Sequence, residues 1–289
     1  MIYKGAFTAL ITPFKKGAID LESYREIIKH QISNNIHGLV ILGSTGESMC
    51  LSYEERRELI SLSVEQSNKQ IPVVVGVGSN NTLESIKLSQ QAQDLGASAL
   101  MAVMPYYNKP SKEGVYHHFR QIAENIDIPL MLYNVPARTC SDIADETVAL
   151  LSEIDNIFAL KDASGDINRV SRYKKINKKL LQFCGEDDLI CQYYSSGGDG
   201  SISVISNAMP KEWSGVYTEF KKGGDEYKGL FSKCKILLSA LSCDSNPVPI
   251  KYVLYKMGMC NEEYRLPLVK LSEANKLLID KALNKLGLV

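Results

Sequence analysis

The chain has 289 residues, 45% hydrophobic and 23% charged, so it is long enough to bury a sizeable core and has the composition of a folded protein. Its 33 Lys and Arg residues are balanced by 33 Asp and Glu residues, which leaves no global field to hold nucleic acid or an anionic membrane. We therefore expect the partner to be a small molecule or another copy of the chain.

Seven scattered cysteines include no Cys-x-x-Cys pair, a pattern typical of free thiols in a reducing compartment. The N-terminal stretch MIYKGAFTALITPF lacks a basic lead and a long apolar run, and no run of about 18 apolar residues occurs in the sequence. These features predict a cytoplasmic protein that is not bound to a membrane.

Short apolar runs recur along the chain, each followed by a turn cluster and then by an amphipathic stretch such as 21–34 or 82–96. Alternating strands and helices imply a parallel sheet, because each right-handed crossover needs a helix. Eight repeats predict a closed (β/α)8 TIM barrel of the α/β class. An open sheet is the rival prediction, but no G-x-G-x-x-G follows the first expected strand, so a dinucleotide-binding sheet is not supported. The eight expected strands are 6–11, 38–42, 72–77, 99–104, 129–133, 158–161, 181–184 and 201–206.

After about residue 224 the pattern becomes helical, with expected helices in 225–242, 249–258 and 268–287. We expect the barrel to occupy residues 1–224, and residues 225–289 to form a C-terminal helical region packed on it.

Active sites of such barrels lie at the carboxyl ends of the strands, and the expected strand 158–161 ends there on Lys161. An ammonium group is costly to bury, so a lysine at this point would by default bend out to water. The alternative is a partly desolvated lysine that acts as a nucleophile toward a carbonyl carbon.

The segment GSTGES, residues 43–48, follows the second expected strand and sets Ser44 and Thr45 between two glycines. Backbone N–H groups and hydroxyls in such a loop suit a carboxylate or a phosphate. The alternative is an ordinary turn before a helix, since Ser52 and Glu55 have the spacing of a capping box.

Two further strand ends carry polar or aromatic groups. Tyr106 and Tyr107 follow the fourth expected strand, where paired aromatics favour packing or an interface. Tyr133 ends the fifth, and Arg138 follows it as either a solvated charge or a fork for a second carboxylate.

Other polar groups have simpler interpretations. The acidic run GEDD, 185–188, fits a helix start better than a metal site, and His117 and His118 lie in a helical pattern without a partner at ligand spacing. An amine, a phenol, hydroxyls and an arginine, with no metal motif, are what carbonyl chemistry through a Schiff base requires.

Six segments, in this order and spacing, resemble the dihydrodipicolinate synthase branch of the pyruvate-dependent lyase and aldolase family. The resemblance covers essentially the whole chain. The arginine of YNVPART favours the synthases over the sister N-acetylneuraminate lyases, while Ser44 stands where most synthases have threonine. The six segments are GSTGES, PYYNKPS, YNVPARTC, LKDASG, GGDGSISV and NPVPIKY.

By this resemblance, Lys161 would form the Schiff base with pyruvate and Tyr133 would be the general acid and base. Ser44 and Tyr107 would complete the proton relay, with Tyr107 reaching into the site of a neighbouring subunit. Thr45 and the backbone at Ile202 would bind pyruvate, Gly185 would line the pocket, and Arg138 would bind the carboxylate of aspartate semialdehyde.

The resemblance further implies a homotetramer built as a dimer of dimers, with no organic cofactor and no catalytic metal. It implies condensation of pyruvate with L-aspartate-4-semialdehyde, on the route to diaminopimelate and lysine. Three alternatives are a keto-sugar-acid lyase, a barrel glycosidase that uses two carboxylates, and a binding protein without activity. The carboxylates available to a glycosidase are Glu47, Asp162 and Glu186.

An allosteric lysine site is also implied, at seven positions. Arg56 would put a fixed cation beside a cationic ligand, so we expect inhibition by lysine to be weak or absent. The seven positions are Ser48, Met49, Tyr53, Arg56, Asn80, Glu84 and Tyr106.

Overall fold

The structure, a computed structural model, describes residues 3–289. Eight strands close into one barrel with the order β1-β10-β9-β8-β7-β6-β5-β4, and helices alternate with them along the chain, so the predicted TIM barrel is confirmed. The strands are β1 (Gly5–Ala9), β4 (Gly38–Ile41), β5 (Val73–Gly76), β6 (Ala99–Val103), β7 (Leu130–Asn134), β8 (Ile157–Asp162), β9 (Leu181–Cys184) and β10 (Gly200–Ser203).

Burial explains why the strands show no polar alternation. Every residue of β4, β5 and β7 is buried, which is expected where side chains on both faces of a parallel strand are covered. Neighbouring strands run parallel, with Val103 opposite Tyr133 and Tyr133 opposite Lys161.

A small antiparallel hairpin that the sequence analysis missed follows the first barrel strand. It joins β2 (Phe14–Lys15) to β3 (Ala18–Ile19), with Phe14 paired to Ile19. Lys16 and Gly17 between them both have positive φ, as a two-residue hairpin turn requires. The first barrel strand ends at Ala9, two residues earlier than the predicted strand over 6–11.

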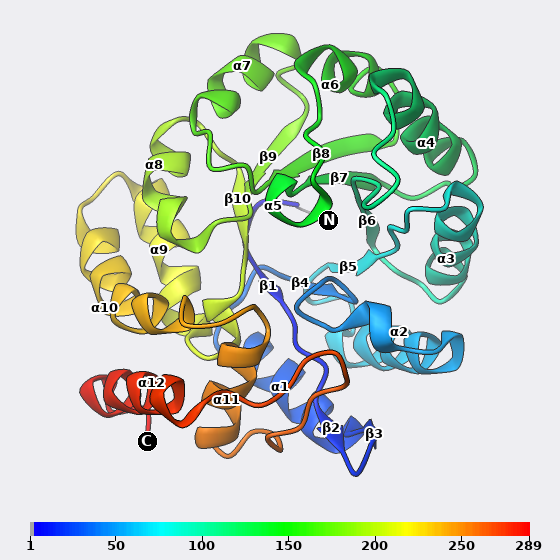
Figure 1. Cartoon of the computed structure of the whole chain (residues 1–289). Coiled ribbons are helices and arrows are strands. Elements are labelled where there is room, and N and C mark those ends of the chain that lie inside the picture. The colour runs from blue at the N-terminus through cyan, green and yellow to red at the C-terminus, as the bar shows by residue number, and fades with distance from the viewer. Residues whose placement is uncertain (1–2) are drawn as a thin grey trace. The chain divides into compact units, whose positions relative to one another are not determined.

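The chain forms two compact units, and the first spans Pro72–Ile202 together with Tyr3 and Lys4. In Figure 1 the longer helices of this unit lie on the outer side of its strands, and apolar side chains such as Phe119 and Leu132 are fully buried. Its helices are α3 (Thr82–Asp94), α4 (Lys112–Glu124), α5 (Pro136–Thr139), α6 (Asp145–Leu151), α7 (Asn168–Ile176), the 3-10 turn η2 (Asp187–Leu189) and α8 (Ile190–Ser195).

The second unit comprises Gly5–Ile71 and Ser203–Val289. The predicted capping box is present, since Ser52 Oγ accepts from the Glu55 N–H at 3.2 Å and the Glu55 carboxylate accepts from the Ser52 N–H at 2.9 Å. Its helices are α1 (Leu21–Ser33), η1 (Ser48–Cys50), α2 (Tyr53–Ser67), η3 (Ile205–Asn207), α9 (Pro210–Lys222), α10 (Glu226–Leu241), α11 (Val248–Lys256) and α12 (Glu273–Leu286).

The C-terminal part of the chain is helical, as the sequence predicts, and α10 packs against α9 and α12. The last helix begins at Glu273 rather than near residue 268, because Ser272 caps it by accepting from the Asn275 N–H at 3.3 Å. The division of the chain at residue 224 stays a prediction. Within residues 3–289, none of the helices combines the length and hydrophobicity that crossing a membrane needs.

Candidate active site

Lys161 lies inside the first unit and does not bend out to water. Its side chain is at the end of β8, only 6% of the residue is exposed, and its Nζ lies 4.0 Å from the ring centroid of Tyr133. Tyr133 is 7% exposed and sits directly opposite Lys161 on the neighbouring strand β7. A cation at this distance is attracted by the face of an aromatic ring, which offsets part of the cost of removing the amine from water.

Gly185 leaves the space that this lysine occupies. A Cβ at Gly185 would lie 3.1 Å from the Cε of Lys161 and 2.7 Å from the Cβ of Ala163, so any side chain there would displace its neighbours. The Gly185 N–H donates to the backbone oxygen of Asp162 at 2.7 Å, which holds the segment after β9 against the end of β8. Ile202, in β10, is buried.

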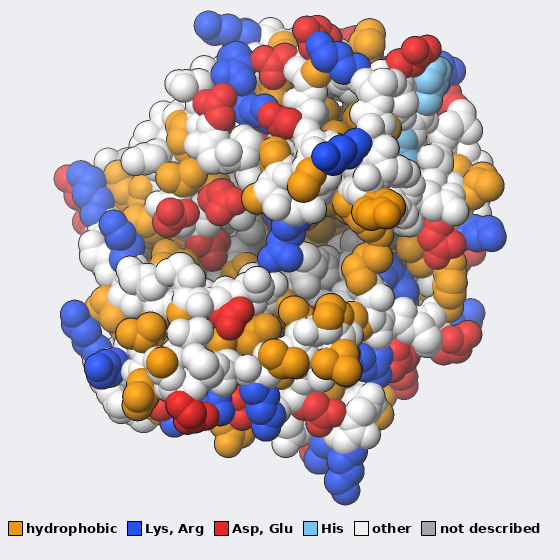
Figure 2. Space-filling view, viewed as in Figure 1, with side chains coloured by type: hydrophobic (Ala, Val, Ile, Leu, Met, Phe, Trp, Pro, Cys, Tyr) orange, Lys and Arg blue, Asp and Glu red, His pale blue; other side chains and the backbone are white. Residues whose placement is uncertain are grey.

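Glu186, next to Gly185, is a titratable group that the sequence predicted only as part of a helix start or as a carboxylate of the glycosidase alternative. Burial and the nearby carboxylates of Asp188 and Asp187 raise the pKa of Glu186 to about 7, against an opposing effect of Lys161. Acidic side chains gather near α8 in Figure 2. Glu186 can therefore change protonation near neutral pH close to the amine of Lys161.

Arg138 and Tyr107 are the exposed predicted residues of the first unit. Arg138 lies in α5, immediately after β7, and its side chain is exposed. Tyr107 is 89% exposed and has a φ of 73°, a left-handed conformation that is unusual for a bulky residue. The Tyr107 side chain, in the segment after β6, is therefore exposed to solvent.

The loop GSTGES lies in the second unit and is held by side chains from distant parts of the sequence. Thr45 is buried, and its Oγ1 accepts a hydrogen bond from Asn246 Nδ2 at 3.0 Å. Thr12 Oγ1 donates to the Gly46 carbonyl at 2.7 Å, and the Glu47 N–H donates to the Ser44 carbonyl at 3.2 Å. The loop is thus more constrained than an ordinary surface turn.

A buried ion pair beneath this loop was missed by the sequence analysis. Lys251 of α11 has no exposed surface, and its Nζ donates to the carboxylate of Glu47, which also accepts from the Arg265 N–H at 3.2 Å. Burial lowers the pKa of Lys251, and Glu47 opposes that effect. Glu47 belongs to the segment GSTGES and Lys251 to NPVPIKY, two of the segments on which the family resemblance rests. Their opposite charges were the sequence signal that could have predicted this ion pair.

The carboxylates proposed for a glycosidase are mostly engaged. Glu47 binds Lys251, and Asp162 accepts hydrogen bonds from Asn134 at 2.8 Å and from Ser164 at 2.6 Å. Only Glu186 of the three lacks such a partner among the bonds described for residues 3–289. A pair of carboxylates poised for glycoside hydrolysis is therefore not supported.

His117 and His118 lie in the helix α4, as their sequence pattern predicts. His118 of α4 is buried with its Nδ1 3.0 Å from Thr82 Oγ1, and burial lowers its pKa to about 4. His117 is exposed. The part of the chain that the structure describes has no group of three or more His, Cys, Asp and Glu residues that could hold a metal ion.

The seven positions of the expected lysine site fall in both units. In the second unit Arg56 is buried and its NH1 donates to the Ser48 carbonyl at 3.1 Å, while Met49 and Tyr53 are exposed. In the first unit the Asn80 carbonyl accepts from Asn108 at 2.8 Å, and Glu84 and Tyr106 are half-buried. Weak inhibition by lysine stays a prediction.

Replacing Lys251 with methionine should destabilise the protein, because it leaves the Glu47 carboxylate buried without its amine. We expect Lys251→Met to lower the free energy of unfolding by about 3 to 5 kcal/mol, measured by denaturant unfolding. The double variant Glu47→Gln with Lys251→Met should recover much of this loss, because no buried charge remains.

Lys256→Met is the matched control on the same helix. Lys256 pairs with Asp280 at 3.3 Å but is partly exposed, so its loss should cost no more than about 1 kcal/mol. Equal losses for the two lysine variants would contradict the assigned role of the buried pair.

The chain resembles known proteins in both sequence and fold. The chain is 40% identical over 290 residues to the 4-hydroxy-tetrahydrodipicolinate synthase of Thermodesulfovibrio yellowstonii, covering 100% of both chains. It superposes with a TM-score of 0.96 on the chloride-inhibited dihydrodipicolinate synthase of Acinetobacter baumannii complexed with pyruvate, at 38% identity and with 100% of both chains covered. A monomeric dihydrodipicolinate synthase variant gives a TM-score of 0.97 at 38% identity, with 99% of this chain and 98% of that chain covered.

The family model described as the dihydrodipicolinate synthetase family matches residues 2–286. This match covers nearly all of the sequence, and the relatives match over their full length. The chain therefore belongs to the dihydrodipicolinate synthetase family.

Proposed function

We propose that this chain condenses pyruvate with L-aspartate-4-semialdehyde through a Schiff base on Lys161, giving 4-hydroxy-tetrahydrodipicolinate for diaminopimelate and lysine biosynthesis. The observation that carries the mechanism is the buried Lys161 amine, 4.0 Å from the ring centroid of Tyr133. Full-length relatives that bear the name of this activity support the substrates, and the chain is accordingly a lyase.

The chemistry begins when the neutral amine of Lys161 attacks the keto carbon of pyruvate and water leaves to form an imine. Loss of a methyl proton gives an enamine, whose carbon adds to the aldehyde of the second substrate. The amino group of that substrate then attacks the imine carbon, closes the ring and releases Lys161. Each cycle consumes one molecule of each substrate and releases one water.

Tyr133 is the group proposed to move protons during these steps. Its ring lies beside the Lys161 amine, because the two residues are opposite each other near the carboxyl ends of β7 and β8. Ser44 and Tyr107 are proposed to complete the relay. By the family resemblance, Tyr107 would act in the site of a neighbouring subunit within a homotetramer, and its 89% exposure is compatible with that role.

The remaining residues are proposed to hold the substrates. Thr45 and the backbone at Ile202 would bind the pyruvate carboxylate, while Gly185 leaves room for the adduct. Arg138 would bind the carboxylate of the semialdehyde, for which a guanidinium offers a bidentate fork. The scattered cysteines, all free thiols, agree with a cytoplasmic location.

The choice of substrate is tested by comparing two reactions of the purified protein. We expect turnover of pyruvate with aspartate semialdehyde to exceed cleavage of N-acetylneuraminate by orders of magnitude, because a synthase site should favour the shorter semialdehyde. Coupled spectrophotometric assays at equal enzyme concentration measure both. Faster cleavage of the sugar acid would assign the chain to the lyase alternative.

Lys161→Ala should lose nearly all turnover while retaining the fold, because it removes the nucleophile. Lys161→Arg should fare no better, since a guanidinium keeps its proton and cannot form an imine. Steady-state assays measure the loss, and circular dichroism with thermal unfolding checks the fold. Near-normal turnover in either folded variant would end the Schiff-base proposal.

Tyr133→Phe should lower turnover by roughly 10² to 10⁴, the range found for general acid and base groups, with a smaller effect on pyruvate affinity. Tyr24→Phe is the control, because it also removes the hydroxyl of a buried tyrosine: Tyr24 Oη of α1 lies 2.9 Å from Ser63 Oγ of α2. The control should keep wild-type turnover. If both variants lost turnover equally, Tyr133 would have no special part in proton transfer.

A further inference from the structure

The residues that follow Tyr133 and Lys161 form a second pair across the same two strands. Asn134 lies opposite Asp162 in the register of β7 and β8, and both side chains are buried. Asn134 Nδ2 donates to Asp162 Oδ1 at 2.8 Å. Because side chains alternate along a strand, this pair lies on the other side of the sheet from the lysine and the tyrosine.

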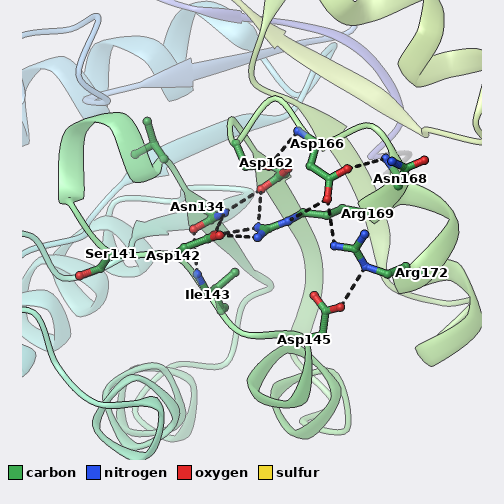
Figure 3. Close-up of polar contacts among 12 residues, drawn as sticks. Asn134, Ser141, Asp142, Ile143, Asp145, Asp162, Asp166, Asn168, Arg169 and Arg172 are labelled. Atoms are coloured by element: carbon green, nitrogen blue, oxygen red, sulfur yellow. Dashed lines mark hydrogen bonds and ion pairs between the residues drawn. The ribbon is translucent and has the colours of Figure 1, made fainter.

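Asp142 joins this pair from the segment that follows α5, the helix that contains Arg138. Asn134 Nδ2 also donates to Asp142 Oδ1 at 2.8 Å, and Asn134 Oδ1 accepts from the Ile143 N–H at 3.1 Å. The amide thereby uses both its donor and its acceptor on the chain around Asp142 and Asp162 (Figure 3). One buried side chain on β7 thus fixes the end of the segment that carries Arg138.

Arg169, from α7, supplies the charge that these carboxylates need. Its NH1 donates to Asp142 Oδ1 at 2.8 Å and to Asp162 Oδ1 at 3.4 Å, and its NH2 donates to Asp142 Oδ2. Figure 3 shows the guanidinium directed at both carboxylates. The Arg169 side chain is 10% exposed and that of Asp142 is 46% exposed, so their pairing is bidentate, with the guanidinium buried and the carboxylate partly open to water.

The ionisation of Asp142 agrees with this arrangement. Partial burial opposes its charge, but hydrogen bonds from Arg169 and Asn134 outweigh that effect and lower the pKa of Asp142. The carboxylate is therefore charged at neutral pH, when the enzyme would work.

We propose that Asp142, held by Arg169 and Asn134, is a positioning residue that sets Arg138 relative to Tyr133 and Lys161 and so determines how the semialdehyde is held. Asp142 is bonded to Asn134 at the end of β7 and, through Arg169, is connected to Asp162 at the end of β8. Only three residues separate Asp142 from Arg138 along the chain. Small displacements of a binding group lose catalysis through lost orientation. This inference rests on the proposed function, in which Arg138 binds the second substrate.

The test is Asp142→Asn, which preserves the shape of the side chain but removes its charge and turns an N–H toward the guanidinium. We expect the KM for aspartate semialdehyde to rise on the order of tenfold, with lower turnover, because a charge-assisted bidentate contact is lost. The KM for pyruvate and trapping of the pyruvate adduct by borohydride should stay within about twofold of wild type. Arg138→Ala, assayed in parallel, gives the scale of a complete loss of the anion contact.

Asp145→Asn is the matched control, drawn from the same cluster. Asp145 accepts from Arg172 Nε at 2.9 Å, and Arg172 also donates to Asp166 at 3.1 Å, but neither bond involves β7, β8 or the segment that carries Arg138. This control should leave the kinetics of both substrates unchanged. A semialdehyde KM altered no more in Asp142→Asn than in Asp145→Asn would overturn the inference.

Two further measurements separate positioning from simple loss of stability. In a double-mutant cycle, Asp142→Asn should add little to the semialdehyde KM of Arg169→Gln, because both changes break one contact. A fall in both substrates' kinetics in step with the melting temperature would mean a structural role only and would overturn the inference. Absence of the borohydride adduct in the wild-type protein would instead refute the proposed function itself.

Discussion

The arrangement of this enzyme depends on one buried contact, the amine of Lys161 against the ring of Tyr133. The parallel register of β7 and β8 brings the two residues opposite each other at the carboxyl ends of their strands. Removing an ammonium group from water is costly, whereas a neutral amine is cheaper to bury and is the form that attacks a carbonyl. The aromatic face offsets part of this cost for the charged form, and the space left by Gly185 accommodates the side chain. In the proposed mechanism the amine loses its proton before it attacks pyruvate.

Side chains alternate between the two faces of β7 and β8, so these strands also carry a second group of interacting residues. Tyr133 and Lys161 share one side of the sheet, and their successors Asn134 and Asp162 share the other, where they bind each other, Asp142 and Arg169. Buried charged groups such as Asp162 and Arg169 are stable only when they are paired. The network therefore cross-links the ends of β7 and β8 next to Tyr133 and Lys161, the residues proposed to react.

In the second unit, hydrogen bonds and a buried ion pair likewise hold a loop that carries predicted site residues. Its glycine-rich loop holds Ser44 and Thr45, and the loop is fixed by Asn246 and by the buried pair of Glu47 and Lys251. Met49 and Leu266 are exposed apolar residues of this unit, and Cys50 Sγ lies 3.6 Å from the Leu266 carbonyl oxygen. Loop rigidity in this unit thus comes from residues about two hundred positions away in sequence.

Sequence periodicity predicts the eight barrel strands because parallel strands are buried on both faces and their apolar runs are separated by helices. It misses the hairpin at 14–19, whose strands are two residues long and have no measurable period. It points to Lys161 and Tyr133 as candidates because each ends an apolar run, and their catalytic roles stay a prediction. It does not identify Asp142, Arg169 or Lys251, because their partners are set by tertiary contacts and charged residues are common throughout the chain.

The most direct test is to incubate the wild-type protein with pyruvate, reduce it with borohydride and map the modified peptide by mass spectrometry. A reduced pyruvate adduct on Lys161, absent when borohydride is added without pyruvate, is the predicted result. An unmodified Lys161 in protein shown independently to be saturated with pyruvate, or an adduct on a different lysine, would contradict the account.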